Sequence, residues 1–569
     1  MKTVLKYLQT YSFRAVVGML IKFTAAICEL LIPLLLERII DVSVPEGDLA
    51  AIWRQSGLMM ALAFGAVLCN ITANRMAAWV SLEITRTLRG DVYRRIETLS
   101  CAQMDRFSQA TLVSRLTNDT YNVHQMFDKI QRGGVRAPML VLGGLTLSFL
   151  MEPILALIML LICILTCLTI WFMTRRGIPY YTRAQESVDT VVRILRENAS
   201  GVRVIRALGQ QIHECDRFEL SNVEACHQEQ RAATTMAATN PLTEFLLSAG
   251  LTLVILMGAY RVNAGLMPAG RVVAFLSYFS LIQTATIGMA KVFVKISKGV
   301  ASAQRLEEIL LLPSEQSTEQ DTSTYTSEVG MQDVSFSYLG IEPNIENASF
   351  TLQKGEMLGI MGAIGSGKTT LVSLLLRLYE VNSGVVWIGG ENVNSQDRRA
   401  LNGRFGVVFQ NSALLSGSIY ENIAFLRDIS REDALSAAKT AQAMEFISTL
   451  PDGMDHHVDI RGGNLSGGQK QRLNIARALA AKPEILVLDS ADSALDYRTA
   501  AALYAAIRRD YPEITLIVIT ERVAPLRNAD RILLLEDGRI AAQGSHKTLL
   551  QASPRYRRIV ELQEGGAVL

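Results

Sequence analysis

Six apolar segments, each long enough to cross a membrane as a helix, lie before residue 300 of this 569-residue chain. A helix needs about 20 apolar residues to span the roughly 30 Å hydrocarbon core of a bilayer. The sequence therefore predicts a domain of six membrane-spanning helices in contact with lipid. The segments have this length and few charges, and they are residues 15–37, 57–80, 134–153, 154–174, 241–262 and 271–294.

The loops between these spans differ in charge, which predicts their side of the membrane. Two long loops, after the second and fourth spans, are rich in arginine, whereas the connections on the opposite side are short and carry few positive charges. Positively charged loops stay in the cytoplasm. We therefore expect a multi-pass protein of the cytoplasmic (inner) membrane with both termini in the cytoplasm. Acidic residues interleave with the arginines and the net charge is only +2, so we expect no nucleic-acid partner.

The composition changes after Lys298, where the apolar pattern ends and a polar stretch follows. We predict a transmembrane domain at 1–312 that includes both long cytoplasmic loops, a linker at 313–328 and a nucleotide-binding domain at 329–569. Strand and helix patterns alternate through the last of these, as in α/β domains. The seven cysteines show no metal-type spacing, so we expect reduced packing residues rather than disulfides.

A phosphate-binding loop opens the soluble part, because residues 362–370 match the pattern G-x-x-x-x-G-K-[ST]. Its glycines let backbone N–H groups close around phosphate oxygens, its lysine reaches the terminal phosphates, and the next hydroxyl binds Mg²⁺. An apolar stretch at 357–361 precedes the loop and a helical pattern at 370–378 follows it, so the phosphates would lie at a helix N-terminus. We therefore expect ATP and Mg²⁺ as cofactors. The predicted contacts are Gly362, Gly365, Ser366, Gly367, Lys368, Thr369 and Thr370.

Two motifs follow this loop, LSGGQ at 465–469 and ILVLDS ending at Ser490. The apolar run at 485–488 predicts a buried strand that delivers Asp489 to the metal. With these motifs, the whole chain resembles a half-transporter of the ATP-binding cassette (ABC) exporter class. It resembles most the degenerate-site subunit of a heterodimeric, multidrug-type exporter. The resemblance implies an α-helical six-span transmembrane domain fused to an α/β P-loop nucleotide-binding domain, the ABC ATPase.

The resemblance also implies roles for single residues. Tyr338 matches the aromatic residue that stacks on adenine, and Gln410 matches a glutamine that contacts Mg²⁺. In this family two nucleotide-binding domains meet head to tail, so the signature motif of one subunit contacts the ATP of the other. The implied metal ligands are Thr369, Gln410 and Asp489. The signature residues that would contact the partner's nucleotide are Ser466, Gly467, Gly468 and Gln469.

Three positions depart from the family pattern. Ser490 replaces the glutamate that polarises the attacking water, and loss of a general base costs about 10² to 10⁴ in rate. Glu521 replaces the histidine that steadies the γ-phosphate, and two like charges about 4 Å apart repel by about 4 kcal/mol at an effective dielectric near 20. Ile460 replaces a glutamate that contacts a cytoplasmic loop. We therefore expect no intact catalytic residue in this chain's own site; the alternative, in which Glu521 serves as a replacement base, requires it to approach the phosphate that it repels.

These departures predict an assembly. A homodimer would hold two weak sites, whereas the intact LSGGQ suits a competent site on a different subunit. We expect a second ABC half-transporter as partner, with an intact catalytic glutamate and an altered signature. Two short helices that dock on nucleotide-binding domains are expected near Phe107–Asp119 and Glu197–Gln211. Closure of the paired domains around ATP would then switch the membrane cavity from inward to outward.

The expected substrate is a small amphipathic molecule, exported across the cytoplasmic membrane as in multidrug efflux. Peptide or lipid export, and an ATP-gated membrane regulator that transports nothing, remain the alternatives. Charges inside spans are rare and usually functional. For Glu29 in the first span, with Lys22 two turns before it, substrate binding and a structural role are both open. For Lys291 and Lys295, near the end of the sixth span, a solvated position is favoured.

Overall fold

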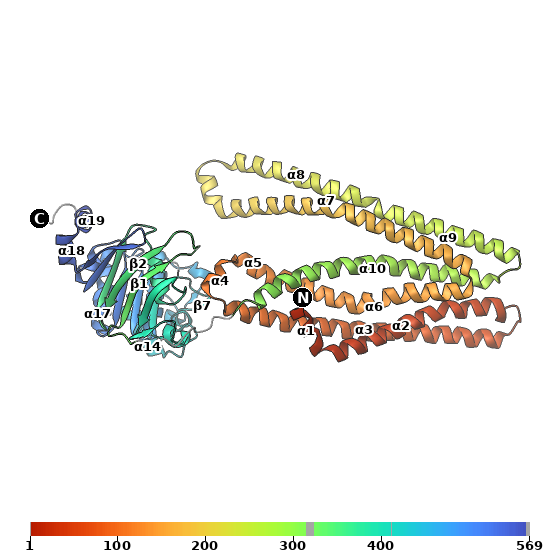
Figure 1. Ribbon diagram of the computed structural model, residues 1–569, viewed down its shortest axis with the longest axis horizontal. Helices are drawn as coiled ribbons and strands as arrows, with labels where there is room; N and C mark the ends of the chain where they lie inside the picture. The colour runs from red at the N-terminus through yellow and green to blue at the C-terminus, as the bar shows by residue number, and fades with distance from the viewer. Residues whose placement is uncertain (1, 314–323, 339, 411, 565–569) are drawn as a thin grey trace. The chain divides into compact units, whose positions relative to one another are not determined.

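A computed structural model describes residues 2–313, 324–338, 340–410 and 412–564 (Figure 1). The chain divides into two compact units. The membrane unit comprises Met1–Glu97 and Gln109–Leu312, and the nucleotide unit comprises Thr98–Ser108 and Pro313–Leu569. Most of the linker predicted at 313–328 lies outside the described residues. A short segment from the first third of the chain thus belongs to the same unit as the C-terminal half.

The membrane unit is built of long helices, and six of them are long and apolar enough to cross a membrane in the described part of the chain. Each contains one of the six spans predicted from the sequence, except that the third span was predicted two residues past Met151, so the prediction of six spans is confirmed. The helices continue well beyond the apolar stretches. Their bounds are α1 (Lys2–Thr10), α2 (Ser12–Arg38), η1 (Ile39–Ser43), α3 (Leu49–Glu97), α5 (Gln109–Ser114), η2 (Arg115–Asp119), α6 (Thr120–Met151), α7 (Pro153–Ala207), α8 (Gln211–Ala237), α9 (Thr239–Asn263) and α10 (Ala269–Leu310).

The third and fourth spans form a tight helical hairpin. Helix α6 ends at Met151, Glu152 has an extended backbone, and Pro153 occupies the first turn of α7. Proline suits that position because the first N–H groups of a helix have no intrahelical partner. The buried Glu152 carboxylate pairs with Arg261 at 2.8 Å, which ties the hairpin to the end of α9.

Helices α2, α3 and α6 share a polar network within the membrane unit. The Lys22 ammonium donates hydrogen bonds to Asn70 Oδ1 at 2.6 Å and Asn74 Oδ1 at 2.9 Å. The Asn70 amide donates to Glu29 Oε1 at 3.0 Å, and Arg136 Nη2 donates to Glu29 Oε2 at 2.8 Å. Both charges that the sequence singled out in the first span therefore bind protein groups. We call Lys22, Glu29, Asn70, Asn74 and Arg136 the polar network.

The lysines of the sixth span and the seven cysteines differ in burial. Lys291 and Lys295 of α10 are exposed on the membrane unit, and their solvated position stays a prediction. All seven cysteines are free, as expected, but three of them are exposed and do not pack in a core: Cys167, Cys215 and Cys226.

Two sheets and a helical subdomain form the nucleotide unit. In the described residues, the larger sheet has six strands in the order β12-β11-β3-β10-β9-β6, and a second sheet has the order β2-β1-β4-β5. Strands β7 and β8 pair separately. The bounds are β1 (Val329–Phe336), β2 (Ile345–Leu352), β3 (Met357–Gly362), β4 (Ser383–Ile388), β5 (Glu391–Asn392), β6 (Phe405–Val408), β7 (Gly417–Ser418), β8 (His457–Val458), β9 (Ile485–Asp489), β10 (Thr515–Ile519), β11 (Arg531–Glu536) and β12 (Arg539–Gly544).

The helices of this unit cover the sheets and bury two apolar clusters. One cluster lies between the sheets around α11, and the other joins the large sheet to α13–α19. The helices are α4 (Cys101–Asp105), α11 (Lys368–Leu375), α12 (Arg398–Gly403), α13 (Ile419–Ala424), α14 (Arg431–Thr440), α15 (Met444–Ile447), η3 (Gly453–Asp455), η4 (Ile460–Gly462), α16 (Gly467–Ala480), α17 (Tyr497–Asp510), η5 (Ala524–Asn528), α18 (His546–Ala552) and α19 (Pro554–Glu564).

The prediction of two short docking helices is only partly right. The segment that joins the nucleotide unit is Thr98–Ser108, which we call the docking segment, rather than Phe107–Asp119. Its helix α4 starts with a capping box, in which Ser100 and Gln103 satisfy each other's backbone N–H groups. At Glu197–Gln211 no separate short helix forms in the described chain, because α7 continues to Ala207 and α8 begins at Gln211.

Candidate functional site

The phosphate-binding loop connects β3 to α11, as the sequence predicted. Gly365 and Gly367 have φ of +84° and +96°, a conformation that side chains rarely adopt. A Cβ on Gly362 would lie 2.4 Å from the Leu535 carbonyl oxygen and 2.6 Å from Ser366 Oγ. The Ser366 hydroxyl is buried without a hydrogen-bond partner among the described residues. A backbone free of side chains and an unsatisfied buried donor are what a phosphate group requires, so these residues fit ATP.

Lys368, the first residue of α11, lies over the loop. Its Nζ donates to the carbonyl oxygens of Gly362 at 2.9 Å and Ala363 at 2.7 Å. Burial lowers the pKa of this ammonium, and the nearby carboxylates of Glu521 and Asp489 oppose that shift. The loop therefore carries a positive charge held by carbonyl oxygens and matched by two acidic groups.

Sheet order brings the other predicted site residues to the same edge. Strands β3, β10, β9 and β6 are neighbours and parallel, so their carboxyl ends meet at one edge of the sheet. The phosphate-binding loop follows β3, and Glu521 follows β10 by two residues. Asp489 ends β9, and Gln410 lies two residues after β6, where it is exposed. Ligands of open α/β sheets bind at this edge.

The residues predicted to hold Mg²⁺ are partly joined by hydrogen bonds. Thr369 Oγ1 donates to Asp489 Oδ2 at 2.9 Å, and Ser490 Oγ donates to Asp489 Oδ1 at 3.3 Å. Asp489 is 1% exposed. Burial raises the pKa of its carboxyl, and the two hydroxyl donors and Lys368 lower it. A hydroxyl and a carboxylate so close together are ligands that Mg²⁺ prefers, and Gln410 would add an amide oxygen.

Tyr338, predicted to stack on adenine, lies close to the start of α11. Its hydroxyl is 3.3 Å from Thr370 Oγ1, to which it donates, and its ring packs edge-on against Phe336 and Tyr379. The side chain is 45% exposed. An aromatic ring held from two sides and partly exposed is suited to a planar base.

The signature residues form the N-terminus of α16. Ser466 caps this helix, with its side chain accepting from the Gln469 backbone while the Gln469 side chain accepts from the Ser466 N–H. A Cβ on Gly468 would lie 3.0 Å from the Ala494 carbonyl oxygen, so this position needs a small residue. Ser466, Gly467 and Gly468 therefore lie at a helix start, where anions bind.

Ser490 and Glu521 flank Asp489 and Lys368. Ser490 has φ of +53° and donates its N–H to the Ile519 carbonyl oxygen at 2.9 Å, which fixes the turn after β9. Its hydroxyl keeps its own proton near neutral pH and is too weak a base to take one from water. Glu521 is exposed and close enough to Lys368 to affect its pKa. Ile460, the third departure, is 76% exposed in η4.

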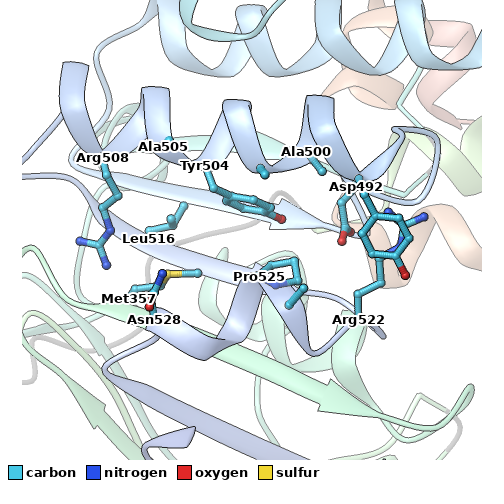
Figure 2. Close-up of a pocket in the computed structure, with 13 residues that line it drawn as sticks. Met357, Asp492, Ala500, Tyr504, Ala505, Arg508, Leu516, Arg522, Pro525 and Asn528 are labelled. Atoms are coloured by element: carbon cyan, nitrogen blue, oxygen red, sulfur yellow. The ribbon is translucent and has the colours of Figure 1, made fainter. Parts of the chain in front are cut away.

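A cavity of about 360 Å³, which no sequence pattern predicts, is lined by α17, η5 and strands of the large sheet (Figure 2). Tyr504 of α17 points along it toward Asp492. The Asp492 carboxylate accepts from Thr520 Oγ1 at 2.8 Å, while the Tyr504 hydroxyl is buried without a hydrogen-bond partner among the residues described. Burial and Asp492 both raise the pKa of Tyr504. These partners lie 12 to 28 positions apart, so no local motif connects them.

Family models match part of the membrane unit and part of the nucleotide unit. Residues 15–286 match the family model "ABC transporter transmembrane region", and residues 345–493 match the model "ABC transporter". An uncharacterized ABC transporter ATP-binding protein of Bacillus subtilis, YfiB, is 34% identical over 569 residues, which cover 99% of each chain. The chain belongs to the ABC transporter family. It is an ABC half-transporter, with six candidate membrane helices fused to one C-terminal ABC ATPase domain, and such domains bind ATP with Mg²⁺.

Other relatives of this ABC transporter carry more specific names. A "Fatty acid ABC transporter ATP-binding/permease protein" of Mycobacterium bovis is 32% identical over 88% of this chain and 80% of its own. An "ATP-dependent lipid A-core flippase" of Vibrio vulnificus is 30% identical over 89% of this chain and 88% of its own. The structure of a bacterial Atm1-family ABC exporter with ATP bound matches 98% of both chains with a TM-score of 0.82 at 22% identity, which establishes the fold.

Replacement of Lys368 by alanine tests the nucleotide site of the transporter. We expect the affinity for ATP to fall about 10- to 100-fold, since a hydrogen bond to a charged group contributes about 1.5–3 kcal/mol. Binding of radiolabelled ATP to the full chain in nanodiscs measures this loss. Lys354→Ala is the matched control, because Lys354 is an exposed lysine of the same unit. Equal affinities in the two variants would remove Lys368 from the site.

Proposed function

We propose that this chain is one half of a heterodimeric exporter, which uses ATP to move small amphipathic molecules out across the cytoplasmic membrane. Its own site retains ATP and cleaves it slowly. Its LSGGQ motif completes the hydrolytic site of a partner half-transporter that carries the catalytic glutamate. The nucleotide unit and both termini lie on the cytoplasmic side.

The observation that carries this proposal is the pair Ser490 and Glu521. Both stand at the carboxyl ends of neighbouring strands, next to the predicted magnesium ligand Asp489 and to Lys368. Position 490 lacks a proton acceptor for the attacking water, and Glu521 adds negative charge where phosphate must lie. Two losses in one site, beside an intact phosphate-binding loop and signature, favour retention of ATP over turnover.

The steps follow from what each group can do. The phosphate-binding loop and Lys368 hold the phosphates, and Thr369, Asp489 and Gln410 supply oxygen ligands for Mg²⁺. Phosphates held by this loop would also meet the signature motif of the partner, and these contacts would favour closure of the two nucleotide-binding domains. The Ser490 hydroxyl leaves the attacking water unactivated, so closure at this site outlasts hydrolysis at the partner's site. Opening then depends on the partner.

ATPase activity of the full chain alone in nanodiscs tests the proposal. We expect ATP binding of ordinary affinity together with an ATPase rate within about threefold of the Lys368→Ala variant, because general-base loss alone costs about 10² to 10⁴ in rate. A brisk rate, well above that of Lys368→Ala, would contradict the proposal and would favour Glu521 as a replacement base. Transport of a fluorescent amphiphile by the reconstituted heterodimer then identifies the partner's contribution.

A second candidate, export of a lipid or fatty acid, has support from the relatives. Two of them, at 30–32% identity over most of this chain, are named for a fatty acid and for lipid A-core. Both cargoes are amphipathic and anionic, so this candidate narrows the substrate without changing the proposed use of ATP.

A further inference from the structure

The segment from Trp171 to Arg183 of α7 combines aromatic rings with arginines outside the nucleotide site. Arg175 lies over the Trp171 ring at 5.3 Å, and Arg176 lies over the Phe172 ring at 5.6 Å. Both pairs are four residues apart, so each arginine is held along the helix by the ring one turn before it. The guanidinium groups are thereby oriented at the protein surface.

Two cavities meet at Arg175. One, of about 420 Å³, is lined by residues of α7 alone: Phe172, Arg175, Arg176, Pro179, Tyr180 and Arg183. The other, of about 540 Å³, lies between α7 and α10, where its apolar lining includes Ile170, Ile178 and Phe293. The first is an open hollow on the helix surface, whereas the volume of the second is within the range of about 300–1,000 Å³ typical of ligand pockets. A charged hollow and an apolar hollow therefore share one side chain.

The arginines of this segment differ from others of α7 and α8 in their ion pairing. No carboxylate of the described residues pairs with Arg175, Arg176 or Arg183, although arginines elsewhere in α7 and α8 do pair, as Arg193 and Arg217 do with Glu197. All three are exposed. Three guanidinium groups within nine residues form a site for an anion, since each offers paired N–H donors to a carboxylate or phosphate.

The position of the segment next to the apolar span further limits the chemical class of the ligand. The fourth predicted span ends at residue 174, so the arginines follow directly on the last apolar turn. Aromatic and basic residues are common at a membrane interface, where they contact lipid head groups. A band of aromatic and basic residues at the interface needs no cavity between two helices. Here, however, an apolar cavity extends from Arg175 toward α10.

We propose that this segment binds an anionic amphiphile with a single acyl chain. The head group, a carboxylate or a phosphate, lies on Arg175, Arg176 and Arg183, and the chain occupies the cavity between α7 and α10. That the ligand is also transported rests on the proposed function. The site itself requires neither ATP nor a partner subunit.

Binding to the full chain in phosphatidylcholine nanodiscs, without ATP, tests the site. The probes are a radiolabelled C16 fatty acid and lysophosphatidate of the same length, with a C16 monoacylglycerol and a C16 trimethylammonium as uncharged and cationic comparisons. We expect both anions to bind at least about tenfold more tightly than the other two. The relative affinity of the two anions shows whether the head group is a carboxylate or a phosphate.

A triple variant, Arg175→Gln, Arg176→Gln and Arg183→Gln, is expected to lower anion affinity at least about tenfold and to leave monoacylglycerol unchanged. The matched control removes three exposed arginines further along the same helix: Arg196→Gln, Arg203→Gln and Arg206→Gln. Equal loss in both triple variants would show general electrostatic attraction and overturn the site. No loss in the first triple would overturn it too.

A separate variant tests the apolar half of the site, which is the cavity between α7 and α10. Thr174→Trp places a large side chain in the cavity between α7 and α10 and is expected to weaken C16 anions while sparing a C6 anion. Equal effects on both lengths would overturn the location of the chain. If anions bind as expected but ATP does not drive their transport by the heterodimer, the site stands and the proposed export of this ligand fails.

Discussion

Replacing Ser490 by glutamate and Glu521 by histidine is expected to raise ATPase activity about 10²- to 10⁴-fold, which is the usual contribution of a general base. The assay uses nanodiscs that hold two copies of the chain. The backbone already suits the change, because the turn at position 490 is fixed by the hydrogen bond from its N–H to Ile519. The new carboxylate would stand next to Asp489, where a proton acceptor is missing.

This expectation depends on the remaining parts of the site being complete. The signature helix is properly capped by Ser466, and the phosphate-binding loop has the positive φ values that its glycines permit. Two copies would therefore supply every part of two sites. The control is Ser490→Gln with Glu521→His, which matches glutamate in size but accepts no proton. Equal rates in the two double variants would show that Ser490 is not what limits hydrolysis.

Loss of Glu29 is expected to destabilise the membrane unit by about 3 kcal/mol. Removing one partner of a buried ion pair costs about 3–5 kcal/mol, and the lower end applies because the Arg136 side chain is 37% exposed. In Glu29→Ala, Arg136 loses its carboxylate and Asn70 loses an acceptor, while Lys22 stays buried at 4% exposure. Thermal unfolding in nanodiscs is expected to shift down by about 5 °C or more.

Glu244→Ala serves as the matched change, since Glu244 is an exposed carboxylate of another membrane helix, α9. It should leave the unfolding temperature nearly unchanged. The double variant Glu29→Ala with Arg136→Ala should recover part of the loss, because it also removes the unpaired cation. If Glu29→Ala and Glu244→Ala unfold at the same temperature, Glu29 has no structural role and the substrate-binding interpretation gains support.

The parts of the molecule that sequence predicted are those encoded locally. The phosphate-binding loop is contiguous, and its glycines and lysine need no distant partner to be recognised. The run before Asp489 predicts a buried strand, which β9 is. The six spans follow from length and hydropathy, because a helix satisfies its own backbone groups within one segment.

Contacts between residues far apart in the sequence could not be predicted, for a physical reason. Lys22 and Asn70 are 48 positions apart, and Glu29 and Arg136 are 107 apart, so the polar network depends on how helices pack. The same holds for Tyr504 and Asp492, which meet only when α17 covers the large sheet. The docking segment was predicted several residues too late, because nothing in its composition marks Tyr379 as its contact. The roles assigned to single site residues remain predictions, which the variants above test.

The docking segment has a mechanical consequence. The Tyr379 hydroxyl donates to Asp105 at 2.6 Å and Gln103 Nε2 donates to the Pro313 carbonyl oxygen at 3.0 Å, so Thr98–Ser108 is fastened to the nucleotide unit. Glu97, its covalent neighbour, ends a single helix of 49 residues. At 1.5 Å per residue that helix is about 70 Å long. A tilt of about ten degrees about the Glu97 end sweeps the far end by roughly 13 Å. A small rotation at the Glu97 end of this helix would therefore become a much larger displacement at its far end.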